Sequence, residues 1–145
     1  MASIKLGGDE IRFISIFETL TGSSVRDCII DPDKNRIVFV VNEGNIGLAI
    51  GKKGANIRRV KNFLKKNIDV VEYASTPEEF LKNALAPARV KNITITNSKK
   101  DGRKIAFVVV DSRDRGIAIG KNGRNIAKAR ILAKRHFDID DVIIN

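Results

Sequence analysis

The sequence predicts an α+β protein, an α/β sandwich in which one small domain occurs twice. Three observations support this prediction. An eleven-residue stretch recurs after 69 positions, an apolar β-branched run precedes each copy, and a helical pattern of apolar residues follows each copy. Each domain therefore has the order helix, strand, strand, helix, helix, strand, with its three strands in one sheet. The two domains are expected at 1–74 and 75–145.

The repeat is most evident around a glycine-rich motif. Residues 47–57 have the sequence GLAIGKKGANI and residues 116–126 have the sequence GIAIGKNGRNI, with eight of the eleven positions identical and no gap. Because one half of the chain repeats the other, we expect an element found in one copy to occur in the other.

The first copy is expected to begin with a helix over about 9–20. Ile14, Phe17 and Leu20 follow a helical period there, and Gly22 provides a stop signal. The later elements are assigned from β-branched runs, from the turn residues between them and from a second helical period. They are strands at 25–30 and 36–41 joined by a turn at 31–35, a short helix before the glycine motif, a helix carrying Ile57, Val60 and Leu64, and a strand near 69–73.

The second copy has a clear helix start signal. Thr76 is suited to the N-cap, Pro77 to the first helical position and Glu79 to closing a capping box, while Pro87 marks the end, so we expect a helix over about 77–86. The remaining elements parallel those of the first copy. They are strands at 90–96 and 105–110 joined by a turn at 97–102, a short helix, a helix carrying Ile126, Ala129 and Ala133, and a strand at 139–144. The 36–41 and 105–110 strands are both expected to be well buried.

The net charge is unevenly placed along the chain. The 145 residues contain 27 Lys and Arg against 17 Asp and Glu, a formal charge of +10. This charge points to a polyanionic partner, with nucleic acid as the first candidate and an anionic membrane or an acidic protein next. Residues 51–66 hold seven basic residues and no acidic one, and residues 120–135 hold six and none. The other 113 positions hold 14 basic and 17 acidic residues. The excess positive charge therefore lies on the glycine motifs and the helices that follow them.

Several classes of protein are excluded or disfavoured by composition. The single cysteine, Cys28, excludes an internal disulfide and suits a reducing cytoplasm, and the absence of a long apolar stretch argues against a membrane protein. Cys28 is expected to be a small core residue, and His136 at a helix end is expected to be structural. The spacing of the glycine motifs does not fit a nucleotide-binding P-loop. We therefore expect no enzyme, and no catalytic residue, metal site or cofactor.

The motif itself favours contact with phosphate. It reads Ile50-Gly51-Lys52-Lys53-Gly54 in the first copy and Ile119-Gly120-Lys121-Asn122-Gly123 in the second. Glycines permit a tight turn and close approach of another backbone, and the helix that follows offers unpaired N–H groups and the positive end of its dipole. The loop lysines add positive charge. Alternatively, the glycines simply form a turn between two helices.

These motifs are the signature of a KH domain. From about residue 5 onward, the chain resembles the tandem type II KH domains of archaeal NusA-like transcription termination and antitermination proteins. The resemblance implies that the loops and the start of the following helices contact RNA. These residues are Gly51, Lys52, Lys53, Gly54, Arg58, Arg59, Gly120, Lys121, Asn122, Gly123, Arg124 and Lys128. Ile50, Ile57, Ile119 and Ile126 either border the base groove or belong to the core, and the recurring Asn56 and Asn125 either cap the loop or contact RNA.

The resemblance implies binding of single-stranded RNA in transcription termination or antitermination, in the cytoplasm and without a membrane. Single-stranded DNA, and RNA polymerase or the transcription complex, are further partners left open. The alternative function is a general RNA-binding protein, or one associated with the ribosome or RNA polymerase in RNA processing or ribosome assembly.

Overall fold

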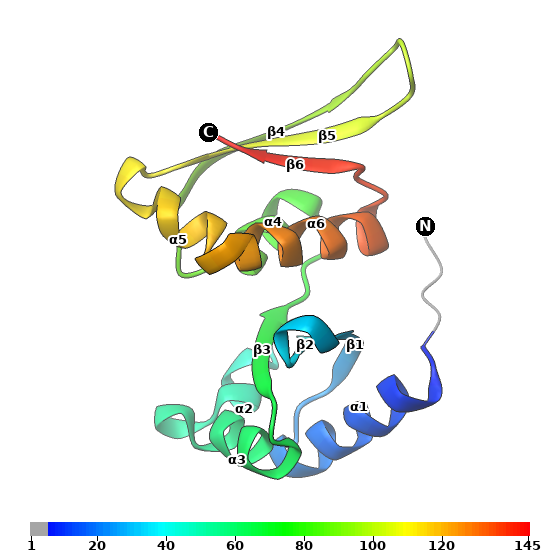
Figure 1. Cartoon of the computed structure of the whole chain (residues 1–145), viewed down its shortest axis with the longest axis vertical. Helices are drawn as coiled ribbons and strands as arrows, with labels where there is room; N and C mark the ends of the chain where they lie inside the picture. Colours follow the sequence, from blue (N-terminus) through cyan, green and yellow to red (C-terminus); the bar gives the residue numbers. More distant parts are fainter. Residues whose placement is uncertain (1–5) are drawn as a thin grey trace. The chain divides into compact units, whose positions relative to one another are not determined.

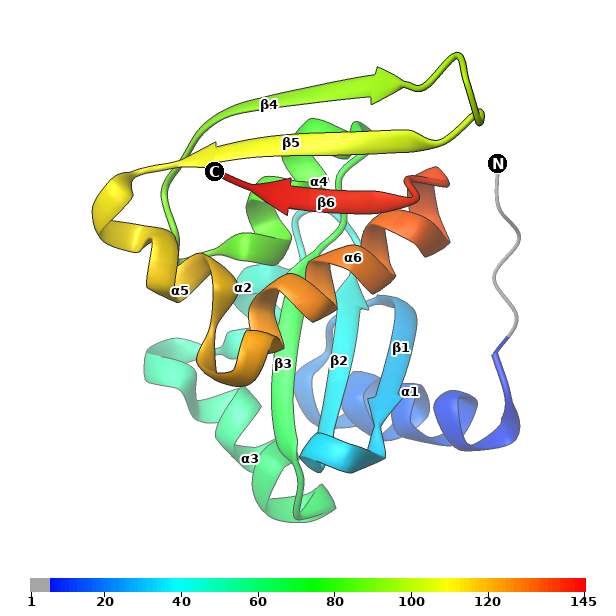
Figure 2. The same cartoon turned by 45° about the horizontal axis from the view of Figure 1, so that its top comes forward.

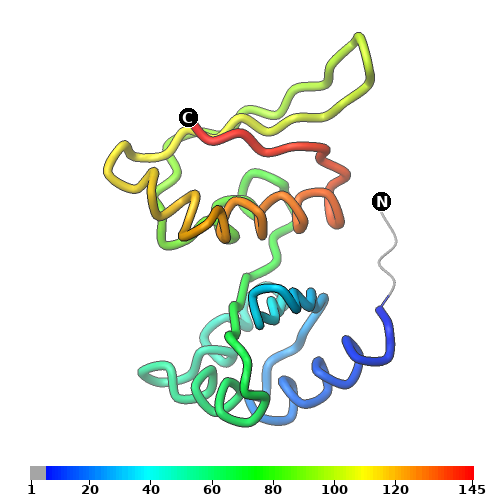
Figure 3. Tube along the Cα trace, viewed as in Figure 1, coloured from blue at the N-terminus to red at the C-terminus, as the bar shows by residue number. Residues whose placement is uncertain are grey.

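The computed structural model describes residues 6–145, so the first five residues of the predicted first domain lie outside the described residues. The described chain divides into two compact units, one ending at Ala74 and the other starting at Ser75 (Figures 1 and 3). Within this described part, none of the helices is both long enough and apolar enough to cross a membrane.

The described part of the first unit contains three α-helices and three strands in the predicted order. They are α1 (Gly8–Thr21), β1 (Val25–Asp31), β2 (Arg36–Val41), α2 (Ile46–Ile50), α3 (Ala55–Leu64) and β3 (Asn67–Glu72). Helix α1 ends as predicted, because Gly22 takes the left-handed conformation with φ of 75°. Strand β3 begins two residues before the predicted start, because the Asn67 N–H donates to the Asn35 carbonyl at 2.8 Å and joins the β2 ladder.

The first sheet has β2 at its centre, antiparallel to β1 and parallel to β3 (Figure 2). Its core cluster draws residues from all three helices and from β1 and β2, and it includes Phe17, Cys28, Ile37, Phe39, Val41, Ala49 and Val60. The rings of Phe17 and Phe39 stack with centroids 4.2 Å apart. Cys28 is 2% exposed, which confirms its predicted place in the core.

The second unit repeats this order and topology. Its elements are α4 (Pro77–Leu85), β4 (Val90–Asn97), β5 (Lys104–Val110), α5 (Arg115–Ile119), α6 (Arg124–Phe137) and β6 (Asp141–Ile144), with β5 central. Thr76 caps α4 as predicted, since its Oγ1 accepts the Glu79 N–H at 3.4 Å. The Glu79 carboxylate, which was expected to close a capping box, instead lies 3.5 Å from Lys82 Nζ. His136, near the end of α6, packs edge-on against Phe80.

The two central strands differ in burial. All six residues of β2 are buried, whereas in β5 Ala106, Val108 and Val110 are buried and Val109 is 37% exposed. The expectation that both strands are well buried therefore holds only for β2. The alternation in β5 follows from the two-residue period of a strand, which places successive side chains on opposite faces of the sheet.

A buried carboxylate fixes the start of α5 to the beginning of β4. Asp114 accepts the Arg89 N–H at 2.9 Å, and its two oxygens also pair with the Arg89 guanidinium at 2.7 and 3.0 Å. These hydrogen bonds with Arg89 lower the pKa of Asp114 from 3.8 to about 2. Asp114 thus links the short helix that precedes the second glycine motif to the sheet.

We expect the Asp114 carboxylate to make the stability of the folded protein depend on pH in the acid range. Its pKa in the folded protein lies below the ordinary value, so its contribution is complete above about pH 4 and is lost as the pH falls from about 4 to about 2. Asp114→Asn should lower the urea midpoint at pH 7 and flatten the loss of stability over that acid range. Asp33→Asn, on the exposed turn after β1, is the control, and equal acid profiles for the two variants would contradict this role.

Candidate nucleic-acid interface

The two glycine motifs have the same backbone conformation. Each forms a single 3₁₀ turn between two helices, at Lys52–Gly54 and at Lys121–Gly123. The first glycine of each has φ and ψ of 76° and 170° in one loop and of 81° and 167° in the other. The residue before the second glycine is left-handed in both, with φ of 53° at Lys53 and 57° at Asn122. The repeat seen in the sequence is therefore a repeat of loop geometry.

The first glycine of each motif is required by space as well as by conformation. A Cβ on Gly51 would lie 2.8 Å from the backbone nitrogen of Asn56, and a Cβ on Gly120 would lie 2.8 Å from that of Asn125. Both glycines also occupy a region of φ and ψ that is essentially restricted to glycine. These positions allow the chain to pass close to the start of the next helix.

The recurring asparagines hold the two sides of each loop together. Asn56 Nδ2 donates to the Leu48 carbonyl at 2.8 Å, and Asn125 Nδ2 donates to the Ile117 carbonyl at 2.8 Å. Each bond satisfies a carbonyl near the end of the short helix, where carbonyls have no partner within the helix. Of the two roles left open by the sequence, the structure supports capping of the loop.

The tip of each loop presents hydrogen-bond donors to solvent. In the first loop, the Gly51, Gly54 and Ala55 N–H groups are used internally. Among the described residues, the Lys52 and Lys53 N–H groups have no internal acceptor, and both lysine side chains are exposed. The second loop repeats this pattern at its two central residues. Because these donors precede the positive ends of α3 and α6, the loops are suited to a phosphate.

An exposed aliphatic side chain borders each loop. Leu48 on α2 is 53% exposed and Ile117 on α5 is 45% exposed, and they occupy matching positions in the repeat. Ile50 is 39% exposed, whereas Ile57, Ile119 and Ile126 are half-buried. Sequence reasoning did not select Leu48 and Ile117. Their signal was an apolar residue three positions before the first motif glycine in both copies.

The predicted cationic contacts are in different surroundings. Arg58 donates to the Lys53 carbonyl and Arg59 donates to the Leu20 carbonyl, yet both guanidinium groups remain exposed, with further donors available. Arg124 is half-buried. Lys128 is only 6% exposed, so the structure does not support the prediction that it faces RNA. The helical period alone could not distinguish this lysine from its exposed neighbours.

Comparison with known proteins gives matches along most of the chain. Residues 11–76 match the KH domain family, and residues 77–144 match the family described as the NusA-like second KH domain. The probable transcription termination protein NusA of Halococcus morrhuae is 42% identical over 96% of each chain. That of Methanocaldococcus jannaschii is 30% identical over 98% of this chain and 75% of the relative. The crystal structure of APE1850 superposes with a TM-score of 0.85 at 36% identity, over 97% of this chain and all of that one.

Proposed function

The chain belongs to the family of NusA-like proteins with tandem KH domains, and we propose that it binds single-stranded RNA through both glycine loops in transcription termination or antitermination. The observation that carries the proposal is the matched geometry of the two loops, each with unused N–H donors and cationic side chains at the start of a helix. A glycine loop of this kind in KH domains clamps the backbone of about four nucleotides.

The proposed contacts divide into two classes. Backbone N–H groups and lysine side chains of the loops bind phosphate oxygens, while Leu48 and Ile117 provide apolar surfaces beside the bases. The proposed phosphate contacts are Gly51, Lys52, Lys53, Gly54, Arg58, Arg59, Gly120, Lys121, Asn122, Gly123 and Arg124. Comparing the affinity for RNA with that for a DNA oligonucleotide of the same sequence tests whether the protein contacts the 2′-hydroxyl group.

Charge reversal in one loop at a time tests the proposal. Lys52→Asp with Lys53→Asp, and separately Lys121→Asp with Asn122→Asp, should each weaken binding of a random-sequence single-stranded RNA by about tenfold or more, because phosphate contacts are replaced by repulsion. Lys99→Asp with Lys100→Asp, in the exposed turn between β4 and β5, makes the same charge change as the first pair. Circular dichroism verifies folding. Equal losses in the loop and turn variants would show that only net charge matters.

The salt dependence of RNA binding gives an estimate of the number of phosphate contacts. Each phosphate contact with a single strand contributes roughly 0.7 to the slope of log K against log salt, so Lys52→Ala with Lys53→Ala should reduce the magnitude of this slope by about 1.4. Titrations at several salt concentrations measure it. An unchanged slope would remove these two lysines from the interface.

Contact with a protein of the transcription complex, such as RNA polymerase, is the second candidate function. It is favoured by Phe63, which is 64% exposed and lines an apolar pocket with Ser15, Ile16, Thr19 and Leu20 on α1. Association with purified RNA polymerase that survives nuclease treatment, and that is lost with Phe63→Ser, would support it.

A further inference from the structure

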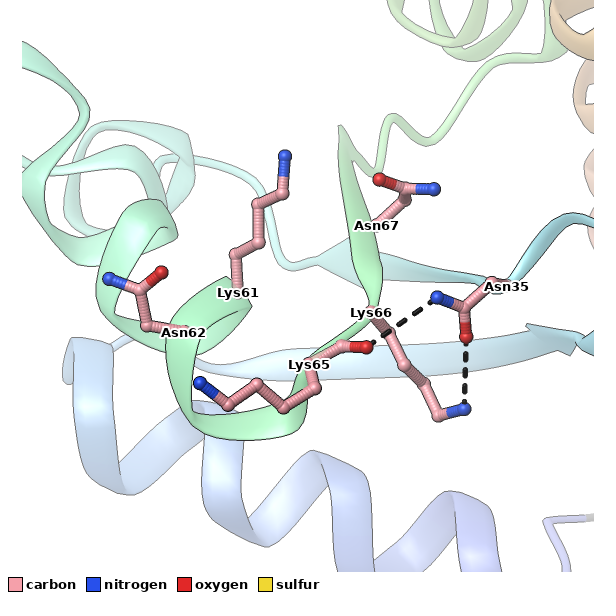
Figure 4. Close-up of a pocket in the computed structure, with 6 residues that line it drawn as sticks. All are labelled: Asn35, Lys61, Asn62, Lys65, Lys66 and Asn67. Atoms are coloured by element: carbon pink, nitrogen blue, oxygen red, sulfur yellow. Dashed lines mark hydrogen bonds between the residues drawn. The ribbon is translucent and has the colours of Figure 1, made fainter.

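A second basic feature lies at the other end of α3, away from the glycine loop. Three lysines and three asparagines line an open pocket of about 290 Å³ (Figure 4). These residues, here called the α3 pocket, are Asn35, Lys61, Asn62, Lys65, Lys66 and Asn67. All six are cationic or neutral and most are exposed, so the α3 pocket offers positive charge and amide groups to solvent.

Among residues 6–145, the lysines of the α3 pocket have no acidic partner. Asn35 links the pocket internally, because its Nδ2 donates to the Lys65 carbonyl at 3.5 Å and its Oδ1 accepts from Lys66 Nζ at 3.3 Å (Figure 4). No carboxylate of residues 6–145 forms an ion pair with Lys61, Lys65 or Lys66. The positive charge at this end of α3 is therefore not neutralised within the described chain.

The second repeat has cations at the same positions but pairs them. Arg130 and Lys134 match Lys61 and Lys65 in the repeat. Arg130 pairs with Asp141 at 3.2 Å, and Lys134 pairs with Asp138 and Asp140 at 3.0 and 2.9 Å.

The strand register shows which residue of the first repeat takes the place of Asp141. Asn67 lies opposite the first residue of β2, and Asp141 lies opposite Ile105 at the matching position in β5. The first repeat thus has an asparagine where the second has the carboxylate that binds Arg130.

A basic stripe joins the α3 pocket to the first glycine loop. Arg58 and Lys61 are three positions apart, which places them on one face of α3, and Gly54 and Lys65 are the residues that cap its two ends. The ten residues of this helix span about 15 Å. In the second repeat Ala127 replaces Arg58, and the stripe is interrupted. The first repeat alone therefore has a continuous path of basic residues leading away from its loop.

We propose that the α3 pocket is a second phosphate-binding site, which holds the RNA strand one helix length beyond the first glycine loop. Ammonium groups of Lys61 and Lys65 bind phosphate oxygens, and the asparagine amides donate to phosphate or sugar oxygens. The inference rests on the proposed RNA-binding function and deepens it, because it makes the footprint of the first domain longer than that of the second.

The test compares short and long RNAs. A tetranucleotide fills one loop, whereas about eight nucleotides also cover α3, since about 15 Å corresponds to roughly four further nucleotides at about 3.4 Å each. Lys61→Ala with Lys65→Ala should leave tetranucleotide affinity unchanged. For the longer RNA it should reduce affinity about fivefold and the salt slope by about 1.4. Asn67→Asp, which supplies the carboxylate of the second repeat, should also weaken only the longer RNA.

Two controls separate the possible outcomes. Lys99→Ala with Lys100→Ala makes the same charge change in an exposed turn and should alter neither affinity. Equal losses for both RNA lengths, or no loss for either, would overturn the α3 pocket proposal while leaving RNA binding at the loops intact. Failure of the parent protein to bind any RNA would overturn both proposals. Uridine monophosphate tests whether the α3 pocket binds a free nucleotide instead. If it binds the pocket as tightly as the longer RNA binds the protein, the proposal that the pocket holds an RNA strand would be overturned.

Discussion

Replacing Gly51 with alanine is expected to lower the free energy of unfolding of the first domain by about 2–4 kcal/mol and to weaken RNA binding. Part of this loss arises because φ of 76° with ψ of 170° is a conformation that alanine adopts only with strain. The rest arises because the new Cβ would lie 2.8 Å from the Asn56 backbone nitrogen and force the loop away from α3.

Gly22→Ala provides the matched control for this variant. Gly22 has nearly the same φ, 75°, but a Cβ there would meet no atom within 4 Å, so only about 1–2 kcal/mol of backbone strain is expected. Tyr73 is the sole tyrosine and the chain lacks tryptophan, so tyrosine fluorescence during urea unfolding reports on the first domain. Equal destabilisation by the two substitutions would show that the loop tolerates a side chain at Gly51.

The largest loss of binding is expected when both loops are reversed in charge together. Substituting aspartate at Lys52, Lys53, Lys121 and Asn122 should reduce RNA affinity by about 100-fold or more, because losses of about tenfold at separate sites multiply. Fluorescence anisotropy with labelled RNA measures the loss.

Its control changes the net charge by the same amount at other exposed positions of the second unit. These positions are Lys91, Asn97, Lys99 and Lys100, again with aspartate at each. If this variant binds RNA as weakly as the two-loop variant, the loops have no special role.

The architecture was predictable because its main signals were local and the glycine motif, with the strand before it and the helix after it, occurred twice. Strand β2 has the predicted bounds, since an uninterrupted β-branched run lies between a proline-containing turn and a short helix. The start of β3 was placed two residues late, because Asn67 joins the sheet through pairing with a strand more than 30 residues away. The pattern of apolar residues within the β3 segment does not show which residues pair with a distant strand.

The site was predictable at its loop and less so around it. Gly51 and Gly120 were identified because the same glycine motif occurs in both copies, and the structure gives the reason, since a Cβ at either position would lie 2.8 Å from a backbone nitrogen. The roles of Asn56 and Arg58 depend on which carbonyl each side chain reaches in space, and the sequence does not specify that. The burial of Lys128 was likewise not predicted. Charge counts along the sequence predicted that the interface is positively charged. They could not show that ion pairs neutralise Arg130 and Lys134, which depends on the folded structure.

The central claim is that the two glycine loops bind the RNA, and a nuclear magnetic resonance titration tests it most directly. Backbone amide resonances of ¹⁵N-labelled protein are followed while single-stranded RNA is added. The account predicts that the amides of 52–53 and 121–122 shift first and furthest, because their N–H groups have no internal acceptor and donate to the phosphates. Saturable shifts confined to other surfaces, with both loops unchanged, would contradict it.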